Sequence, residues 1–163
     1  MSKGLSGLFR GTMGSKAAAG SSMLMNPSDD FVRNIANRRD VDANGYYDVV
    51  AHGSPDSILV YHKGANVRVT HRVLARILRH DEKYNGQAIR LLSCSTGSST
   101  GHFAQDLANK LGVPVKAPTD ILWAWPQGGY RVAGKKRVGD IDLPDTSKPG
   151  KFTSFYPRRR KLK

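Results

Sequence analysis

Short apolar runs that alternate with amphipathic stretches constrain the fold of this chain more than any other feature of its sequence. The runs have the length of buried strands, and the stretches between them repeat apolar residues at helical spacing. This alternation is typical of right-handed crossovers between parallel strands. We therefore predict an α/β fold with a mainly parallel central sheet and helices on both faces. The predicted order is strand, helix, strand, helix, strand over Tyr46–Ala51, His71–His80, Ala88–Ser93, Phe103–Leu111 and Val113–Ala117.

Further elements flank this alternating region. Ser28 or Asp29 is expected to cap a short helix that runs to about Arg39, and a turn follows at Asp42–Gly45. A second short strand is expected at Ser57–Tyr61. A β-hairpin extension is expected after residue 120, because a turn at Pro126–Gly129 separates two strand-like runs. The strands expected in the last part of the chain are Ile121–Trp125, Tyr130–Ala133, Arg137–Ile141 and Phe152–Tyr156.

The length of 163 residues fits one compact domain, which we place at residues 26–157. Residues 1–25 are rich in Gly, Ser, Lys and Ala and are predicted to form a flexible basic leader, and residues 158–163 a basic tail. The formal net charge of +13 favours an anionic partner such as nucleic acid, an anionic membrane surface or a polyphosphate. No apolar run approaches the roughly 20 residues of a transmembrane helix.

Two reactive side chains follow two of the predicted strands. His52 comes directly after the strand at Tyr46–Ala51, and Cys94, the single cysteine, directly after the strand at Ala88–Ser93. Ligands of parallel sheets bind at the carboxyl ends of the strands, where both side chains would emerge together. An imidazole beside a thiol can act as its general base. A lone cysteine after an apolar run is more often a packed core residue, but its pairing with His52 favours a catalytic site.

Backbone groups at the same strand ends could bind a developing negative charge. Gly53 would leave its N–H unobstructed, and the N–H of Cys94 could supply a second oxyanion donor. The Gly- and Ser-rich loop after Cys94 would leave room for a polypeptide above the sulfur.

The segments Ala51-His52-Gly53 and Leu91-Leu92-Ser93-Cys94-Ser95-Thr96-Gly97 resemble the caspase-like superfamily of cysteine peptidases. The resemblance covers about residues 46–122 and is nearest to the self-cleaving peptidase and effector domains of large bacterial polymorphic toxins. It implies a caspase-like three-layer sandwich, with His52 and Cys94 as a catalytic dyad acting on a protein or peptide substrate. The acidic residue that many relatives carry just before the nucleophile is missing here, so the specificity stays open.

The resemblance also implies a biological setting. The chain would be a secreted or injected bacterial effector that acts in the cytosol of a target cell and cleaves a protein target or its own parent chain, with a parent toxin or a delivery protein as a possible partner. No cofactor is required. An inositol polyphosphate activator could bind a basic patch at Lys116, Lys135, Lys136 and Arg137, although an exposed basic surface is the simpler interpretation.

Other polar residues are candidates for substrate binding. Asp56 and Asp120 follow predicted strands and could line the substrate groove or orient His52, with Asp120 favoured. Trp123 is a further groove candidate. His102 is the only rival base near Cys94 in the sequence. The remaining histidines are scattered without acidic or thiol neighbours, so we predict no structural metal.

A different class of function is a caspase-like binding module without peptidase activity. Such a module would hold an anionic partner with its basic ends, and its binding would depend steeply on salt. Another toxin chemistry is a third alternative, although the sequence lacks the acidic metal cluster that many nucleases use.

Overall fold

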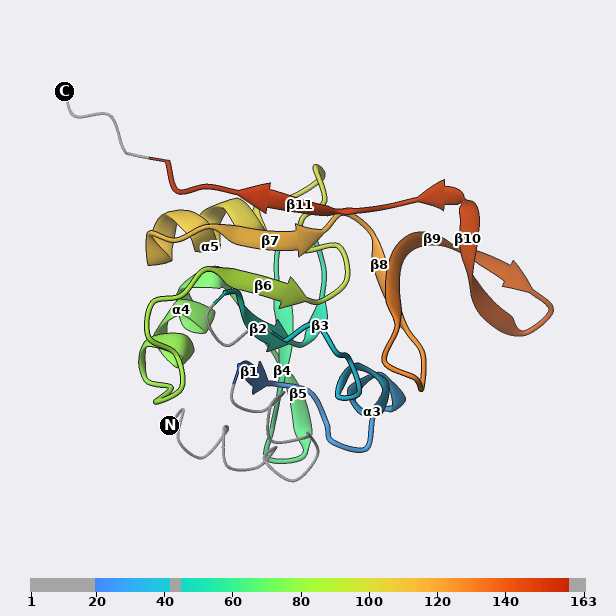
Figure 1. Ribbon diagram of the computed structural model, residues 1–163, viewed down its shortest axis with the longest axis horizontal. Coiled ribbons are helices and arrows are strands. Elements are labelled where there is room, and N and C mark those ends of the chain that lie inside the picture. Colours follow the sequence, from blue (N-terminus) through green and yellow to red (C-terminus); the bar gives the residue numbers. More distant parts are fainter. Residues whose placement is uncertain (1–19, 42–44, 159–163) are drawn as a thin grey trace.

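The computed structural model describes residues 20–41 and 45–158 and centres on a five-stranded mixed sheet (Figure 1). The strand order is β1-β2-β6-β7-β11, in which the first four strands are parallel and β11 is antiparallel to β7. The predicted α/β class with a mostly parallel sheet is therefore confirmed. The strands are β1 (Ser21–Met23), β2 (Tyr47–Val50), β6 (Ile89–Leu92), β7 (Val115–Pro118) and β11 (Phe152–Phe155).

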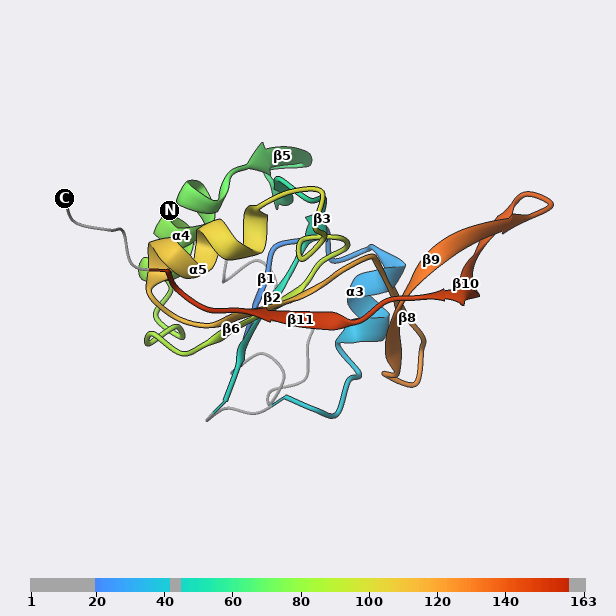
Figure 2. The same ribbon diagram turned by 90° about the horizontal axis from the view of Figure 1, so that it is seen from above.

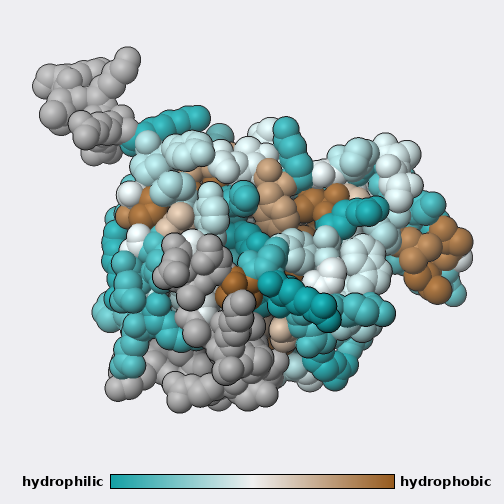
Figure 3. Space-filling model, in the orientation of Figure 1, coloured by the Kyte–Doolittle hydropathy of each residue, from teal (hydrophilic) through white to brown (hydrophobic). Residues whose placement is uncertain are grey.

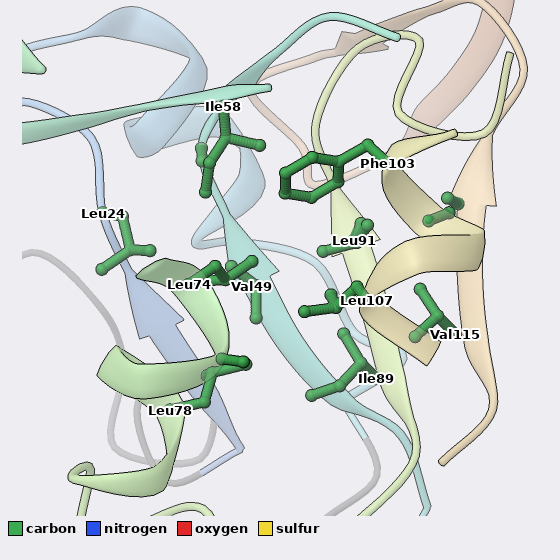
Figure 4. Close-up of a cluster of buried hydrophobic side chains, with 14 of the residues drawn as sticks. Leu24, Val49, Ile58, Leu74, Leu78, Ile89, Leu91, Phe103, Leu107 and Val115 are labelled. Carbon is green, nitrogen blue, oxygen red and sulfur yellow. The ribbon is translucent and has the colours of Figure 1, made fainter. Parts of the chain in front are cut away.

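One face of this sheet is covered by two helices, α4 (His71–Arg79) and α5 (Phe103–Leu111), which lie side by side in Figures 1 and 2. Alternate residues of the strands point to this face, so Val49 and Leu91 pack against Leu74 and Leu107 (Figure 4). Both helices occur at the predicted positions, because their apolar residues recur at helical spacing.

The opposite face of the sheet packs against α3 (Asp30–Ile35) and the hairpin that follows β7. Val50 and Leu92, one residue further along their strands, contact Val32 and Ile35 of α3 in a second core. Helices therefore lie on both faces, as predicted. However, α3 ends at Ile35 rather than near Arg39.

A three-stranded antiparallel sheet follows residue 120, where the sequence predicts a hairpin extension. It consists of β8 (Ile121–Ala124), β9 (Tyr130–Val138) and β10 (Ile141–Pro149). The predicted strand at Arg137–Ile141 is wrong, because Gly139 turns the chain with φ 61°. The β9–β10 ribbon projects from the body, and its tip exposes Val138 and Ile141 (Figures 1 and 3).

A second small sheet continues from β2. It contains β3 (His52–Gly53), β4 (Ile58–His62) and β5 (Ala65–Val69) in an antiparallel arrangement. The strand predicted at Ser57–Tyr61 corresponds to β4, but β3 and β5 were not expected from the sequence.

The predicted boundary of the domain at residue 26 is wrong. β1 pairs in parallel with β2, and Met23, Leu24 and Met25 are almost fully buried. Small residues such as Ser21 and Ser22 disguise this strand in the sequence, because they fit a crowded sheet edge without an apolar pattern. The rest of the predicted leader (1–19), most of the turn at 42–45 and the tail beyond Arg158 lie outside the described residues.

A buried ionic cluster fixes α3 and β9 to the sheet. Asp48 on β2 accepts bonds from Arg38 Nε at 2.9 Å and from Arg90 Nε at 2.7 Å. Arg90 also bonds to Asp40 and Tyr130, and Tyr130 donates its hydroxyl to Asp40. Burial would raise the pKa of Asp40, but the hydrogen bonds from Arg90 and Tyr130 hold it below its ordinary value.

No helix in the described part of the chain is long and apolar enough to cross a membrane.

Candidate active site

The structure brings the two predicted reactive strand ends together. β2 and β6 are parallel neighbours with Val50 opposite Leu92, and His52 and Cys94 each come two residues after this last pair. The two segments touch just beyond the strands, because a Cβ added at Gly53 would lie 2.7 Å from the carbonyl oxygen of Cys94. Any side chain at Gly53 would therefore force the Cys94 loop to move.

His52 and Cys94 also belong to the same face of the sheet. Val50 and Leu92 point toward the core formed with α3, and residues two positions further along extended strands point the same way. Cys94 packs against this core, and His52 contacts the start of α3.

The partner of His52 is Asp29, a residue that the sequence identified only as a helix cap. His52 Nε2 lies 2.9 Å from Asp29 Oδ2. Asp29 Oδ1 accepts the N–H of Phe31 and so caps α3. One carboxylate thus caps the helix and orients the imidazole. The expectation that Asp56 or Asp120 orients His52 is wrong for this conformation.

The thiol of Cys94 lies under the first strand of the hairpin extension. The backbone N–H of Leu122 lies 3.4 Å from Cys94 Sγ. Burial raises the pKa of the Cys94 thiol, and the N–H groups of Leu122 and of Cys94 itself offset this only in part. Burial therefore favours the neutral thiol over the thiolate.

The imidazole and the thiol each have a different partner in the structure. Within residues 20–41 and 45–158, His52 pairs with Asp29 and Cys94 pairs with Leu122, and no hydrogen bond joins the two side chains. Catalytic hydrogen bonds are often long in a free enzyme and shorten when substrate binds.

The loop after Cys94 is held in a tight conformation between two strands. Ser95 has φ 60°, a left-handed conformation that is uncommon for a residue with a side chain. Its N–H donates to the carbonyl of Asp120 at 2.9 Å, and the N–H of Gly97 donates to Pro118 at 2.8 Å. A Cβ at Gly97 would meet Ala117 O at 2.5 Å, which explains the glycine.

The two predicted oxyanion donors lie at this junction. The N–H of Ser54 donates to Ser57 O in the pairing of β3 with β4. Hydrogen-bonded and non-hydrogen-bonded pairs alternate along an antiparallel ladder, so the N–H of the preceding residue, Gly53, is not used in this pairing. The N–H of Cys94 is directed toward its own sulfur. Gly53 itself lies against the backbone of Cys94.

Asp120 is the one predicted substrate-binding residue that lies beside the thiol. Its backbone carbonyl holds Ser95, and its charge contributes to the raised pKa of Cys94. No basic side chain forms an ion pair with Asp120 in the described parts of the chain.

Replacing Asp120 by asparagine is expected to lower the pKa of the Cys94 thiol, because the neighbouring negative charge is lost. Iodoacetamide should then label the variant faster than the wild type at every pH below about 9, where the thiolate is the minor species. Asp56→Asn is the matched control and should leave the labelling profile unchanged. Identical profiles for Asp120→Asn and the wild type would contradict the interaction.

Asp56 and Trp123 are not brought to the thiol. Asp56 lies in the β3–β4 turn and accepts the N–H of His102 at 3.3 Å, so it supports the start of α5. Trp123 donates its indole N–H to Ala133 O and lies on the face of β8 opposite to Leu122. Its position on the outer face was not predictable, because either face of a hairpin strand fits a tryptophan.

The residues suggested for inositol polyphosphate binding do not form one patch. Lys116 on β7 lies over the ring of Tyr46, whereas Lys135 and Arg137 pair with Asp142 on the ribbon. The two groups belong to different sheets. This correction removes the structural basis for a shared activator site at these four positions.

A family model described as a domain of unknown function (DUF8616) matches residues 21–132. The chain belongs to this family. The DUF8616 match begins at β1 and ends within β9, so it includes Asp29, His52, Cys94 and Asp120. Most of the β9–β10 ribbon lies outside it. No curated protein and no solved structure matches the chain.

No group of three or more His, Cys, Asp or Glu side chains that could hold a metal ion occurs among the residues that the structure describes.

Proposed function

We propose that this DUF8616 domain is a cysteine endopeptidase in which Cys94 is the nucleophile and His52 the general base. One observation carries the proposal: a carboxylate–imidazole pair, Asp29–His52, follows β2, and the thiol of Cys94 follows β6, the parallel neighbour of β2. A base that is oriented by a third group and adjoins a nucleophile is the arrangement that covalent catalysis requires.

The proposed reaction begins with proton transfer from Cys94 Sγ to His52 as the sulfur attacks the scissile carbonyl carbon. The N–H groups of Gly53 and Cys94 would donate to the oxyanion that forms. His52 then gives the proton to the leaving amine, and an acyl-enzyme remains. His52 next removes a proton from water, which attacks the thioester and releases the acid and the thiol.

Because the pKa of the Cys94 thiol is raised, we expect the thiol to transfer its proton to His52 as it attacks the substrate. The alternative, a thiolate and an imidazolium already present in the free enzyme, is disfavoured. Asp29 stabilises the imidazolium that forms in this step, because its carboxylate already contacts His52 Nε2. The active-site thiol is thus expected to react slowly with small alkylating reagents at pH 6.

A caspase-like sandwich is the fold that we propose for the domain. Its support is the order of the parallel strands, with the histidine after β2 and the cysteine after β6, and helices on both sheet faces. The roles as a toxin, as an injected effector and as a self-cleaving domain stay predictions from the resemblance.

The proposal is tested by incubating the full chain with a mixture of defined peptides and identifying new termini by mass spectrometry. Because Cys94 is the only cysteine, full alkylation with iodoacetamide blocks this residue alone. We expect cleavage by the untreated protein and none by the alkylated protein. Equal product from both samples, or no product from the untreated protein, would reject the proposal.

Asp29→Asn is expected to lower kcat by about 10²–10⁴-fold with little change in KM, because Asp29 positions the base and does not contact substrate. Asparagine is as good a helix cap as aspartate, so α3 should persist. Asp30→Asn, a neighbouring exposed carboxylate, is the matched control. A kcat within about twofold of the wild type would exclude a role for Asp29.

A further inference from the structure

A row of arginines covers the solvent face of α4. Arg72, Arg76 and Arg79 are exposed and follow one another at spacings of four and three residues, so they lie on one side of the helix. We call these three residues the arginine ridge. With a rise of 1.5 Å per residue, their Cα atoms span roughly 10 Å. The opposite side of α4 is buried through Leu74, Ala75 and Leu78.

The charges of the arginine ridge are not neutralised within the described ranges. The guanidinium groups of Arg72 and Arg76 make no ion pair or hydrogen bond there, and Arg79 donates only to the carbonyl of Lys110 at 2.8 Å. That bond joins the ridge to the basic last turn of α5. Asp106 faces His71 at 3.9 Å, and the exposed Glu82 follows Arg79 by three residues.

The neighbouring His71 lies among charges of both signs. The pKa of His71 is lowered, first by burial and then by the charges of Arg72 and Lys110, although Asp106 opposes the change. Some basic residues elsewhere are paired, as are Lys135 and Arg137 with Asp142 and Arg90 with Asp40 and Asp48. The ridge is therefore a row of three cations without an ion pair among the described residues.

The chemistry of the ridge distinguishes between anionic partners. A helix that binds a membrane surface places apolar side chains in the lipid, but the apolar side of α4 is in the protein core. A protein partner normally buries an apolar or aromatic centre, and the exposed side of α4 has none. Arginine forks suit phosphate oxygens, to which they donate paired hydrogen bonds.

We infer that the arginine ridge of α4 binds the phosphate backbone of double-stranded nucleic acid without reading its sequence. The absence of an exposed aromatic side chain on α4 fits contacts to phosphates rather than stacking on bases. This binding surface is separate from the residues at Cys94 and stands whether or not the domain cleaves peptides. In this inference the anionic partner binds to helix α4, whereas from the sequence we expect it to bind to the basic ends of the chain.

The test is fluorescence anisotropy of the full chain with two labelled 20-base-pair DNA duplexes of unrelated sequence, over a series of NaCl concentrations. We expect equal affinity for both duplexes. In the Arg72→Gln/Arg76→Gln/Arg79→Gln variant, affinity near 100 mM NaCl should fall at least about tenfold. The slope of log Kd against log salt should also fall by about three. The variant Lys135→Gln/Lys136→Gln/Arg137→Gln removes the same charge from the ribbon and should lose far less.

Other results would overturn the inference. These are no binding of either duplex, an equal loss in the ribbon variant, or a loss of most affinity on truncation after Pro157. Equal or stronger binding to vesicles containing phosphatidylserine, lost in the same ridge variant, would assign the surface to lipid instead. Arg72→Gln/Arg76→Gln keeps the bond from Arg79 to Lys110, so a partial loss in this variant excludes misfolding of α4 as the cause.

Discussion

Cys94→Ala is expected to abolish peptide cleavage, lowering kcat/KM by at least about 10⁴-fold, because no other thiol exists in the chain. The fold should persist. Alanine fills part of the same half-buried space, and the loss of one sulfur atom should change the free energy of unfolding by only about 1 kcal/mol. Cleavage rates and urea denaturation of the same preparation separate the two effects.

His52→Ala should lose a similar factor, and the double variant should lose little more than either single variant. Residues that act in one proton transfer are strongly non-additive, because removing either one disables the same step. The control is His102→Ala, which removes the rival imidazole at the start of α5 and should retain nearly full activity. Independent, additive losses would show that His52 does not act through Cys94.

The main elements could be predicted because their signals are local. The apolar alternation of β2 and β6 and the helical spacing in α4 and α5 depend only on nearby residues, and each element occurs within about two residues of its predicted position. β1 and β5 were not predicted. β1 consists mostly of small residues and carries no apolar pattern, whereas β5 alternates Ala65, Val67 and Val69 with polar residues, a strand signal that the prediction missed.

The candidate site also contains residues that could be predicted from the sequence and contacts that could not. His52 and Cys94 follow strands that the pattern identifies, and the general rule for parallel sheets places them at one edge. Asp29 was visible only as a helix cap, because its contact with His52 joins residues 23 positions apart through the packing of α3 on the sheet. The burial of Cys94 under Leu122 likewise depends on the folding back of β8, which no local spacing encodes.

The packing of α3 depends on the buried ionic cluster, so Asp48→Ala is expected to destabilise the domain by about 3–5 kcal/mol. Asp48 is 1% exposed and neutralises Arg38 and Arg90, whose side chains are 0% and 12% exposed. Its removal leaves two guanidinium groups buried without their shared carboxylate. Burial opposes the charge of Arg90, and its pKa is raised only because Asp48 and Asp40 accept its hydrogen bonds.

Urea denaturation followed by circular dichroism measures this effect, and the matched control is Asp30→Ala. Asp30 pairs with Arg33 on the surface, where the side chains are 84% and 64% exposed, so its loss should cost less than about 1 kcal/mol. If Asp48→Ala were no less stable than Asp30→Ala, the cluster would not hold α3. Because Arg38 follows α3 and Asp29 caps it, Asp48→Ala protein that still folds should also lose activity, through displacement of Asp29 from His52.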